Sequence, residues 1–333
     1  MTRPIKVVQY GVGPVGSEIV KLLSGKQGVE IVGAIDIDKE KVGKDLGDLV
    51  GASKPLGVCV SSDADEVLAK AKAEVVLHST ASYLNAVSPQ ILKCVKARSN
   101  VISTCEELAY PFETNQKIAL QLDRLAKRYG VTVLGTGVNP GFIMDTLPIA
   151  LTGACPSVTQ VSVTGIVDAS KRRLQLQRKI GAGLSPEEFR RLVQERKVRH
   201  VGLEESIRMI ASGLGWKLDR VEETVEPVIA EVDVESLYLK VEKGRVAGVK
   251  QFGRGVVRGR EAITLDLQMY VGAKEPRDSV VIEGVPPIDM TIRGGLHGDL
   301  ATAAIVVNSI PKVLKAEPGL LTMKDLPVLS AIP

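Results

Sequence analysis

The sequence predicts an α/β protein, with a doubly wound parallel sheet followed by a smaller α+β domain that contains an antiparallel sheet. Three observations support this fold class. Between residues 5 and 137, short apolar runs alternate with segments of helical spacing. A glycine-rich turn follows the first apolar run directly. From about residue 157 the pattern changes to long stretches of alternating apolar and polar residues, joined by turns that contain glycine.

The first domain is expected to begin with a strand at residues 5–10 and a helix that opens at the glycine turn. Further strands are predicted from runs rich in branched side chains, at residues 29–36, 74–80, 100–104 and 131–137. The helices between them are predicted at residues 65–72, 87–98 and 113–130. This alternation is typical of βαβ units, so a parallel sheet with helices on both faces is expected within residues 1–140.

The second domain is expected to cover residues 141–297. It is predicted to contain a strand at 157–167, an antiparallel sheet from the alternating stretch 225–272, and a helix at 185–197. Ser185 before Pro186, with Glu188 three residues after the serine, is the pattern of a capping box at the start of that helix. Residues 298–333 are expected to contain an apolar helix that ends near Pro311 or shortly beyond it and packs back on the first domain.

Composition excludes several kinds of partner. The net charge of +4 arises from 43 basic and 39 acidic residues that are interspersed, and aromatic residues make up only 3%, so no nucleic-acid partner is expected. No apolar run approaches the roughly eighteen residues that span a bilayer, so no membrane partner is expected. The four cysteines lack close spacing, so we expect no metal site and a reduced, cytoplasmic protein.

The turn "GVGPVG" predicts a dinucleotide-binding, Rossmann-type domain. Gly11, Gly13 and Gly16 match G-x-G-x-x-G, and Asp36 lies twenty residues after Gly16 at the end of the second predicted strand. Gly11 permits the tight turn, Gly13 lets the backbone approach a pyrophosphate, and Gly16 lets the helix pack close to the strand. The start of the helix offers N–H groups to phosphates. The alternative is a glycine turn that binds no ligand.

The cofactor is expected to be NAD(H), with NADP(H) as the alternative. Asp36 can accept hydrogen bonds from the adenosine ribose and repels a 2′-phosphate. Lys39, Lys41 and Lys44 weaken this argument because a nearby cation can shield a phosphate. The predicted cofactor-binding residues are Gly11, Gly13, Pro14, Val15, Gly16, Asp36, Ser79 and Thr80.

Polar residues follow the carboxyl ends of three predicted strands, where an open parallel sheet binds its ligands. Ser79 and Thr80 are predicted to hydrogen-bond the nicotinamide ribose. The neighbouring His78 is interpreted as a half-buried histidine with its hydrogen bonds satisfied, and the alternative is a proton shuttle. The turn that begins at Asn139 leads toward the second domain.

Two adjacent glutamates follow the strand at 100–104. Thr104 with Glu107, and Ser103 with Glu106, both fit the S/T-x-x-E pattern of a capping box. If only one box forms, the other carboxylate is available at the edge of the sheet. We predict that Glu106 is the catalytic carboxylate, because it leaves the strand first, and keep Glu107 as the alternative.

The segments "STCEELAYP", "GTGVNPGFIMD", "KIGAG" and "GGLHGDLATAAIVVNSIP", together with the glycine turn, resemble the 2,4-diaminopentanoate dehydrogenases and native amine dehydrogenases. The resemblance covers nearly the whole chain. It implies a fold like that of dihydrodipicolinate reductase and NAD(P)-dependent conversion of an amine to a ketone plus ammonia, or the reverse. It also implies a catalytic glutamate in this cluster, and a C-terminal sheet domain that contacts substrate and a second subunit, so a homodimer is expected.

The substrate is expected to be a small amine, either a simple alkylamine or one like 2,4-diaminopentanoate. Apolar residues after the Asn139 turn are predicted to line its pocket, and cations or a helix start to hold its carboxylate. The predicted substrate-binding residues are Asn139, Phe142, Met144, Arg173, Lys179 and His297. Two alternatives remain at this stage. One is another dihydrodipicolinate reductase-like or amino acid dehydrogenase, and the other is a dinucleotide sensor without catalysis.

Overall fold

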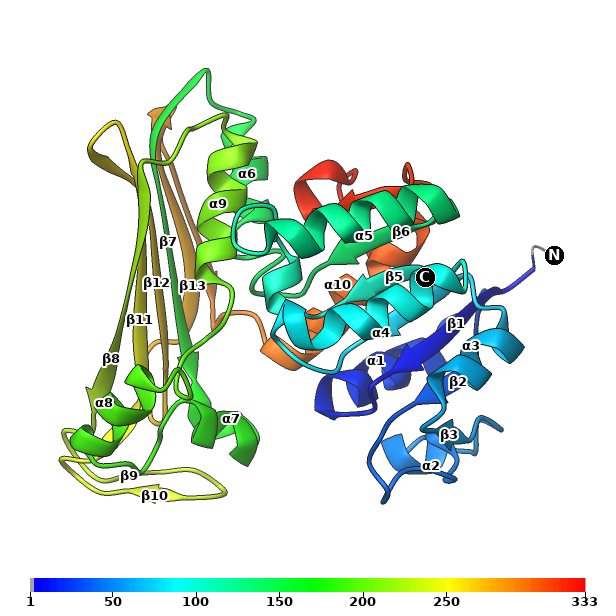
Figure 1. Cartoon of the computed structure of the whole chain (residues 1–333). Coiled ribbons are helices and arrows are strands. Elements are labelled where there is room, and N and C mark those ends of the chain that lie inside the picture. Colours follow the sequence, from blue (N-terminus) through cyan, green and yellow to red (C-terminus); the bar gives the residue numbers. More distant parts are fainter. Residues whose placement is uncertain (1–2, 333) are drawn as a thin grey trace. The chain divides into compact units, whose positions relative to one another are not determined.

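The computed structural model describes residues 3–332 and divides into two compact units. Unit 1 comprises the chain up to Phe142 together with the segment that begins at His297. Unit 2 is continuous, from Ile143 to Leu296. Figure 1 shows that unit 1 contains a sheet with helices on its faces, whereas unit 2 is dominated by long strands.

Unit 1 contains a seven-stranded sheet in which every pair of neighbouring strands is parallel. The strand order is β15-β6-β5-β4-β1-β2-β3. Their bounds are β1 Ile5–Tyr10, β2 Val29–Ile35, β3 Val60–Ser61, β4 Val75–His78, β5 Asn100–Ser103, β6 Thr132–Gly135 and β15 Gly319–Leu321. The order reverses between β1 and β4, which is the switch point where such sheets bind ligands. The predicted doubly wound sheet is therefore confirmed.

Helices cover both faces of this sheet. Their bounds are α1 Pro14–Ser24, α2 Leu46–Val50, α3 Ala64–Ala71, α4 Leu84–Lys96, η1 Glu106–Leu108, α5 Gln116–Tyr129, α10 Gly298–Val313 and η3 Met323–Asp325. One core, with buried Val8, Val76, Ile91 and Leu122, joins α3, α4 and α5 to the sheet. Helix α10 contacts α1, β5 and β6, so the C-terminal segment belongs to unit 1 (Figure 1). It passes Pro311 and ends at Val313, as the sequence predicts.

Two strands of this sheet have no counterpart in the sequence prediction. β15 pairs in parallel with β6 through residues 319–321, and β3 pairs with β2 through only two residues. Runs of two or three residues are too short to show a periodicity, because a period-two pattern needs at least four. Pairing with an existing strand, and not local preference, makes these segments strands.

Unit 2 contains a six-stranded sheet of order β14-β13-β7-β12-β11-β8. The bounds are β7 Ser157–Asp168, β8 Arg220–Ile229, β11 Val246–Val257, β12 Arg260–Tyr270, β13 Arg277–Val285 and β14 Ile288–Arg293, with a separate pair β9 Val234–Glu235 and β10 Lys240–Val241. The sheet is mixed, because β12 runs parallel to β7. The predicted antiparallel pairing is present among β8, β11 and β12, whereas the parallel pair of β12 with β7 was not predicted. The long chain between β7 and β12 provides the crossover that parallel neighbours need.

The helices of unit 2 are α6 Thr146–Thr152, η2 Ala169–Lys171, α7 Leu174–Lys179, α8 Pro186–Gln194 and α9 Leu203–Gly213. The predicted capping box of α8 is present, with Ser185 Oγ accepting from Glu188 N and Glu188 Oε2 from Ser185 N. Helix α9 lies on β11, where a Cβ at Gly253 or Gly255 would lie 2.8 Å from the Ile207 side chain. These glycines allow the close contact. Within residues 3–332, none of the helices is long and apolar enough to cross a membrane.

Candidate active site

The glycine turn between β1 and α1 has the backbone geometry that a dinucleotide requires. Gly11 has φ +91°, and a Cβ there would lie 2.5 Å from Ser79 O. A Cβ on Gly16 would lie 2.0 Å from Gly11 O, so this position admits only glycine. A Cβ on Gly13 would meet no atom within 4 Å. Gly11 and Gly16 are therefore required by the protein itself, whereas Gly13 leaves space beside the turn.

The start of α1 is suited to a phosphate group. Gly13 is the N-cap, makes no side-chain capping bond, and is followed by Pro14 at the first helical position. Val15 lies partly exposed in the same first turn. The backbone N–H groups of this turn have no capping side chain, and the helix dipole favours an anion there. The residues present thus fit the pyrophosphate of NAD(P).

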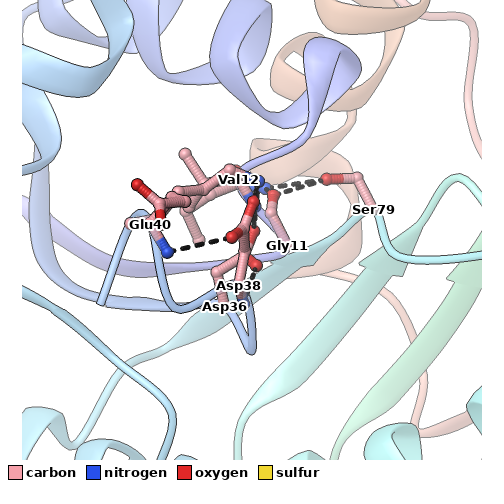
Figure 2. A network of polar contacts seen from close by, with 8 residues as sticks. Gly11, Val12, Asp36, Asp38, Glu40 and Ser79 are labelled. Carbon is pink, nitrogen blue, oxygen red and sulfur yellow. Dashed lines mark hydrogen bonds and ion pairs between the residues drawn. The ribbon is translucent and has the colours of Figure 1, made fainter.

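Asp36 follows β2 directly and lies beside Val12 and Asp38 (Figure 2), and three donors bind its carboxylate. Its Oδ2 accepts from Val12 N at 2.7 Å and from Lys41 Nζ at 3.2 Å, and its Oδ1 accepts from Asp38 N at 2.9 Å. Burial by itself raises the pKa of Asp36. The hydrogen bonds from Asp38, Val12 and Lys41 outweigh burial and hold this pKa below its ordinary value. Asp36 is therefore an anion and acts as a hydrogen-bond acceptor beside the glycine turn.

The side chains of Ser79 and Gln9 hydrogen-bond the backbone of the glycine turn. Ser79 Oγ donates to Gly11 O at 2.9 Å, and Gln9 Nε2 donates to Gly11 O at 2.8 Å and to Ser79 Oγ at 2.9 Å (Figure 2 shows Ser79 beside Gly11). The contact of Ser79 with the nicotinamide ribose stays a prediction. Gln9 was not identified from the sequence, although an amide inside the apolar run "IKVVQY" is a signal that such a partner exists.

His78 is fully buried, not half-buried as predicted. Ser103 Oγ lies 2.9 Å from its Nδ1, and Gln90 Oε1 lies 2.8 Å from its Nε2. Gln90 Oε1 can only accept a hydrogen bond, so this contact assigns the proton of His78 to Nε2, and Nδ1 accepts from Ser103 Oγ. Burial lowers the pKa of His78 from 6.5 to about 4. His78 is a neutral structural residue that joins β4, β5 and α4.

Thr80 follows His78 on the exposed side of the same network. Its Oγ1 donates to Gln90 Oε1 at 2.7 Å and lies 3.1 Å from His78 Nε2. The side chain is therefore held at the exit of β4. Its predicted contact with the nicotinamide ribose remains a prediction.

The two glutamates after β5 have different surroundings. Neither predicted capping box forms, because η1 begins at Glu106 with Cys105 as the N-cap and has no side-chain cap. Glu107 instead caps another helix: its Oε2 accepts from Leu84 N, the first residue of α4, at 2.7 Å. Tyr83, the N-cap of α4, makes no side-chain capping bond, so this N-terminus takes a carboxylate from elsewhere in the chain.

Glu106 is partly buried, and Ser82 Oγ donates to its Oε1 at 3.1 Å. Ser82 belongs to the segment between β4 and α4, and its carbonyl accepts from Glu107 N at 3.3 Å and from Cys105 Sγ at 3.2 Å. Burial first, and then the charge of Glu106, raise the pKa of the Cys105 thiol far above its ordinary value. Cys105 therefore stays a neutral thiol. Hydrogen bonds thus connect the segment after β4 to the segment after β5, and the Glu106 carboxylate lies at the carboxyl edge of the sheet.

The predicted substrate-binding residues are divided between the two units. Asn139 and Phe142 lie in the segment after β6, whose Val138 N donates to Thr302 Oγ1 of α10 at 3.2 Å. His297 caps α10, with Nδ1 accepting from Leu300 N at 3.5 Å. In unit 2, Met144 is fully buried, Arg173 is the N-cap of α7, and Lys179 is the exposed last residue of that helix. Their contacts with a substrate stay predictions.

The doubly wound sheet, the glycine turn and Asp36 define the class: a Rossmann-type, dinucleotide-binding protein with a second, mixed-sheet unit. Sequence comparison gives the family. The 2,4-diaminopentanoate dehydrogenase C-terminal domain family matches residues 142–333, and the dihydrodipicolinate reductase N-terminus family matches residues 5–105. The chain belongs to the 2,4-diaminopentanoate dehydrogenase family and is an NAD(P)-dependent oxidoreductase of the amine dehydrogenase type.

Three relatives illustrate the match. A 2,4-diaminopentanoate dehydrogenase from Acetoanaerobium sticklandii is 39% identical over 98% of this chain and 95% of its own. An amine dehydrogenase from Streptomyces virginiae is 24% identical over 98% of both chains. The solved structure of an amine dehydrogenase from Mycobacterium smegmatis is 28% identical, with a TM-score of 0.88 over 98% of this chain and 97% of its own. The fold and family implied by the sequence resemblance are confirmed.

Proposed function

We propose that this protein catalyses the oxidative deamination of a small amine to a ketone and ammonia, and the reverse reductive amination, with Glu106 as the catalytic carboxylate. The choice of Glu106 over Glu107 is supported by the different hydrogen-bond partners of the two carboxylates. Glu107 is bonded to Leu84 N as a helix cap, whereas Glu106 lies at the ligand-binding edge of the sheet with a hydroxyl donor on one oxygen. The reaction class follows from the family to which the chain belongs.

The nicotinamide, when bound, accepts hydride from the amine-bearing carbon and returns it in the reverse direction. The protein must then stabilise an iminium cation on the substrate and activate the water that attacks it. An ionised Glu106 does both, because its negative charge stabilises the cation and its oxygen accepts the proton from water. In reductive amination the same carboxylate accepts a proton from ammonium and orients the ammonia.

Ser82 is a positioning residue in this mechanism. Its hydroxyl donates to Glu106 Oε1 and so fixes one oxygen of the carboxylate, while its carbonyl is bound to the β5 exit. A donated hydrogen bond also favours the ionised form of a carboxylate, which is the form that accepts the proton. Ser82 thus supports both the orientation and the charge of Glu106.

The amine is proposed to be one like 2,4-diaminopentanoate, after the name of the 39% identical relative, or a simpler alkylamine. Arg173, Lys179 and His297 are then the candidates for its carboxylate, and Asn139, Phe142 and Met144 for its pocket. Unit 2 is proposed to carry substrate and dimer contacts, in a homodimer located in the cytoplasm. These proposals rest on the sequence resemblance, and light scattering of the purified protein measures the subunit number.

The test of the catalytic assignment is Glu106→Gln, which keeps the shape of the side chain and removes its charge. We expect turnover with 2,4-diaminopentanoate and with short alkylamines to fall by roughly a hundred- to ten-thousand-fold. NADH binding, followed by fluorescence titration, is expected to persist. Turnover within a few-fold of the parent, measured as NAD(P) reduction at alkaline pH, would refute the role of Glu106. If the parent oxidises no amine while still binding NADH, the proposed reaction itself is wrong.

A further inference from the structure

The loop that follows β2 holds one ammonium group between two carboxylates. Lys41 Nζ lies 3.2 Å from Asp36 Oδ2 and 3.4 Å from Asp38 Oδ2. The backbone fixes this arrangement, because Lys41 N and Val42 N both donate to Asp38 O and form a helical turn. The turn brings Lys41 back over Asp38, three residues earlier. Figure 2 shows Asp36 and Asp38 next to each other beside the glycine turn.

The oxygens of Asp36 are largely used by the protein. Oδ2 accepts from Val12 N and Lys41 Nζ, which fills its two acceptor positions, and Oδ1 accepts from Asp38 N. One acceptor position remains on Oδ1 among these contacts. That position suits a single hydroxyl donor, such as a ribose hydroxyl.

The charge of this group disfavours a phosphate. Two carboxylates and one ammonium sum to a net charge of −1 over Asp36, Asp38 and Lys41, and a phosphate monoester adds about −1.5 to −2 at neutral pH. The side chain of Lys41 is only 26% exposed, and a phosphate would have to draw it away from both partners. Lys39 and Lys44 lie on the same loop but are exposed, where solvent and salt weaken their effect.

We propose that Asp38 is a specificity-determining residue for the cofactor. By holding Lys41 against Asp36, Asp38 withholds this cation from a 2′-phosphate and makes the enzyme selective for NAD over NADP. The inference rests on the dinucleotide site of the proposed function and adds the residue that decides which dinucleotide binds. It also explains why the lysines of this loop need not cancel the preference of Asp36 for NAD, since the ammonium group of Lys41 is already paired with two carboxylates.

The test is Asp38→Asn in the full-length protein, with NADH and NADPH binding measured by calorimetry. Asparagine keeps an oxygen that can accept from Glu40 N, as Asp38 Oδ1 does at 3.0 Å, so the turn is retained. We expect the parent to bind NADH more tightly than NADPH by roughly tenfold or more, and Asp38→Asn to narrow that ratio by roughly tenfold. The gain in NADPH affinity is expected to shrink as salt is raised.

Two further variants identify the cation. The double variant Asp38→Asn/Lys41→Met is expected to lose the gain in NADPH affinity, whereas Lys44→Met, as the matched control, is expected to leave the ratio within about twofold. Asp38→Ser provides a second neutral side chain that can accept from Glu40 N if the asparagine variant is unstable.

Several outcomes would overturn the proposal. These are equal affinity of the parent for NADH and NADPH, an unchanged ratio in folded Asp38→Asn and Asp38→Ser, and a gain that survives the loss of Lys41. Any of them with NADH binding intact rejects only the role of Asp38. Failure of the parent to bind either dinucleotide would reject the dinucleotide site and therefore the proposed function as well.

Discussion

Replacement of Glu107 by alanine removes a helix cap and is predicted to destabilise unit 1 without removing catalysis. The bond from Leu84 N to Glu107 Oε2 is 2.7 Å long, charge-assisted and partly buried. Such bonds contribute about 1.5–3 kcal/mol, and a carboxylate at a helix N-terminus adds about 0.3–1 kcal/mol. Glu107 is partly exposed, which weakens both effects. We therefore expect Glu107→Ala to lower the free energy of unfolding by about 2 kcal/mol.

Differential scanning calorimetry measures this loss. For a cooperative unit of this size, about 2 kcal/mol corresponds to a decrease in Tm of about 4–8 °C. Glu107→Gln is the graded control, since its amide oxygen still accepts from Leu84 N but carries no charge, and about half of the decrease is expected. Turnover below the unfolding temperature is expected to stay within about threefold of the parent for both variants.

The opposite pattern would refute the reasoning. If Glu107→Ala leaves Tm unchanged and lowers turnover a hundredfold, while Glu106→Gln remains active, the two glutamates have been assigned the wrong way round. The comparison is informative because the two residues are adjacent, have the same charge and belong to the same short helix.

Three other predictions follow from the site. Gly16→Ala is expected to destabilise the fold and abolish NADH binding, since its Cβ would lie 2.0 Å from a carbonyl oxygen. Gly13 has φ −78° and open space around it, so Gly13→Ala should change the free energy of unfolding by under about 0.5 kcal/mol and mainly weaken NADH binding. Thermal unfolding measures the effect on stability, and fluorescence titration measures the effect on NADH binding. The pKa of His78 falls from 6.5 to about 4 on folding, so the unfolded chain binds more protons than the folded one between these two pH values. The free energy of unfolding should therefore drop by about 3 kcal/mol as the pH falls from about 6.5 to 4. Urea unfolding should show this loss in the parent but not in His78→Asn. Ser82→Ala should move the acidic limb of the kcat/KM profile to higher pH and lower kcat, and Ser82→Thr should restore the profile and kcat of the parent. An equal effect of Ser82→Ala in the Glu106→Gln background would show that Ser82 does not act by positioning the Glu106 carboxylate.

Most of unit 1 could be predicted from the sequence because its signals are local. The glycine spacing, the acid after the second strand and the alternation of apolar runs with helical segments each lie within one βαβ unit. The capping box of α8 was predicted for the same reason, since Ser185 and Glu188 lie three residues apart. In these cases the interacting groups are neighbours in the chain, so spacing alone fixes their geometry.

The parts that were predicted wrongly, or not at all, depend on contacts between distant segments. β15 becomes a strand only because β6 offers a free edge more than 180 residues earlier in the chain, and β12 lies parallel to β7 only because of the crossover between them. His78 is fully buried because α4 and β5 cover it, which its own surroundings in "VVLHST" do not reveal. Local preference does not encode such pairings.

The sequence by itself predicts a dinucleotide site at the start of α1 and offers Glu106 or Glu107 as the catalytic carboxylate. Only the tertiary structure showed that the two carboxylates have different surroundings. Both glutamates satisfy the same local capping pattern, whereas their actual partners, Ser82 and Leu84, lie 24 and 23 residues away in the chain. The physical reason is that the uncapped N-terminus of α4 takes the carboxylate that folding brings within 2.7 Å of it.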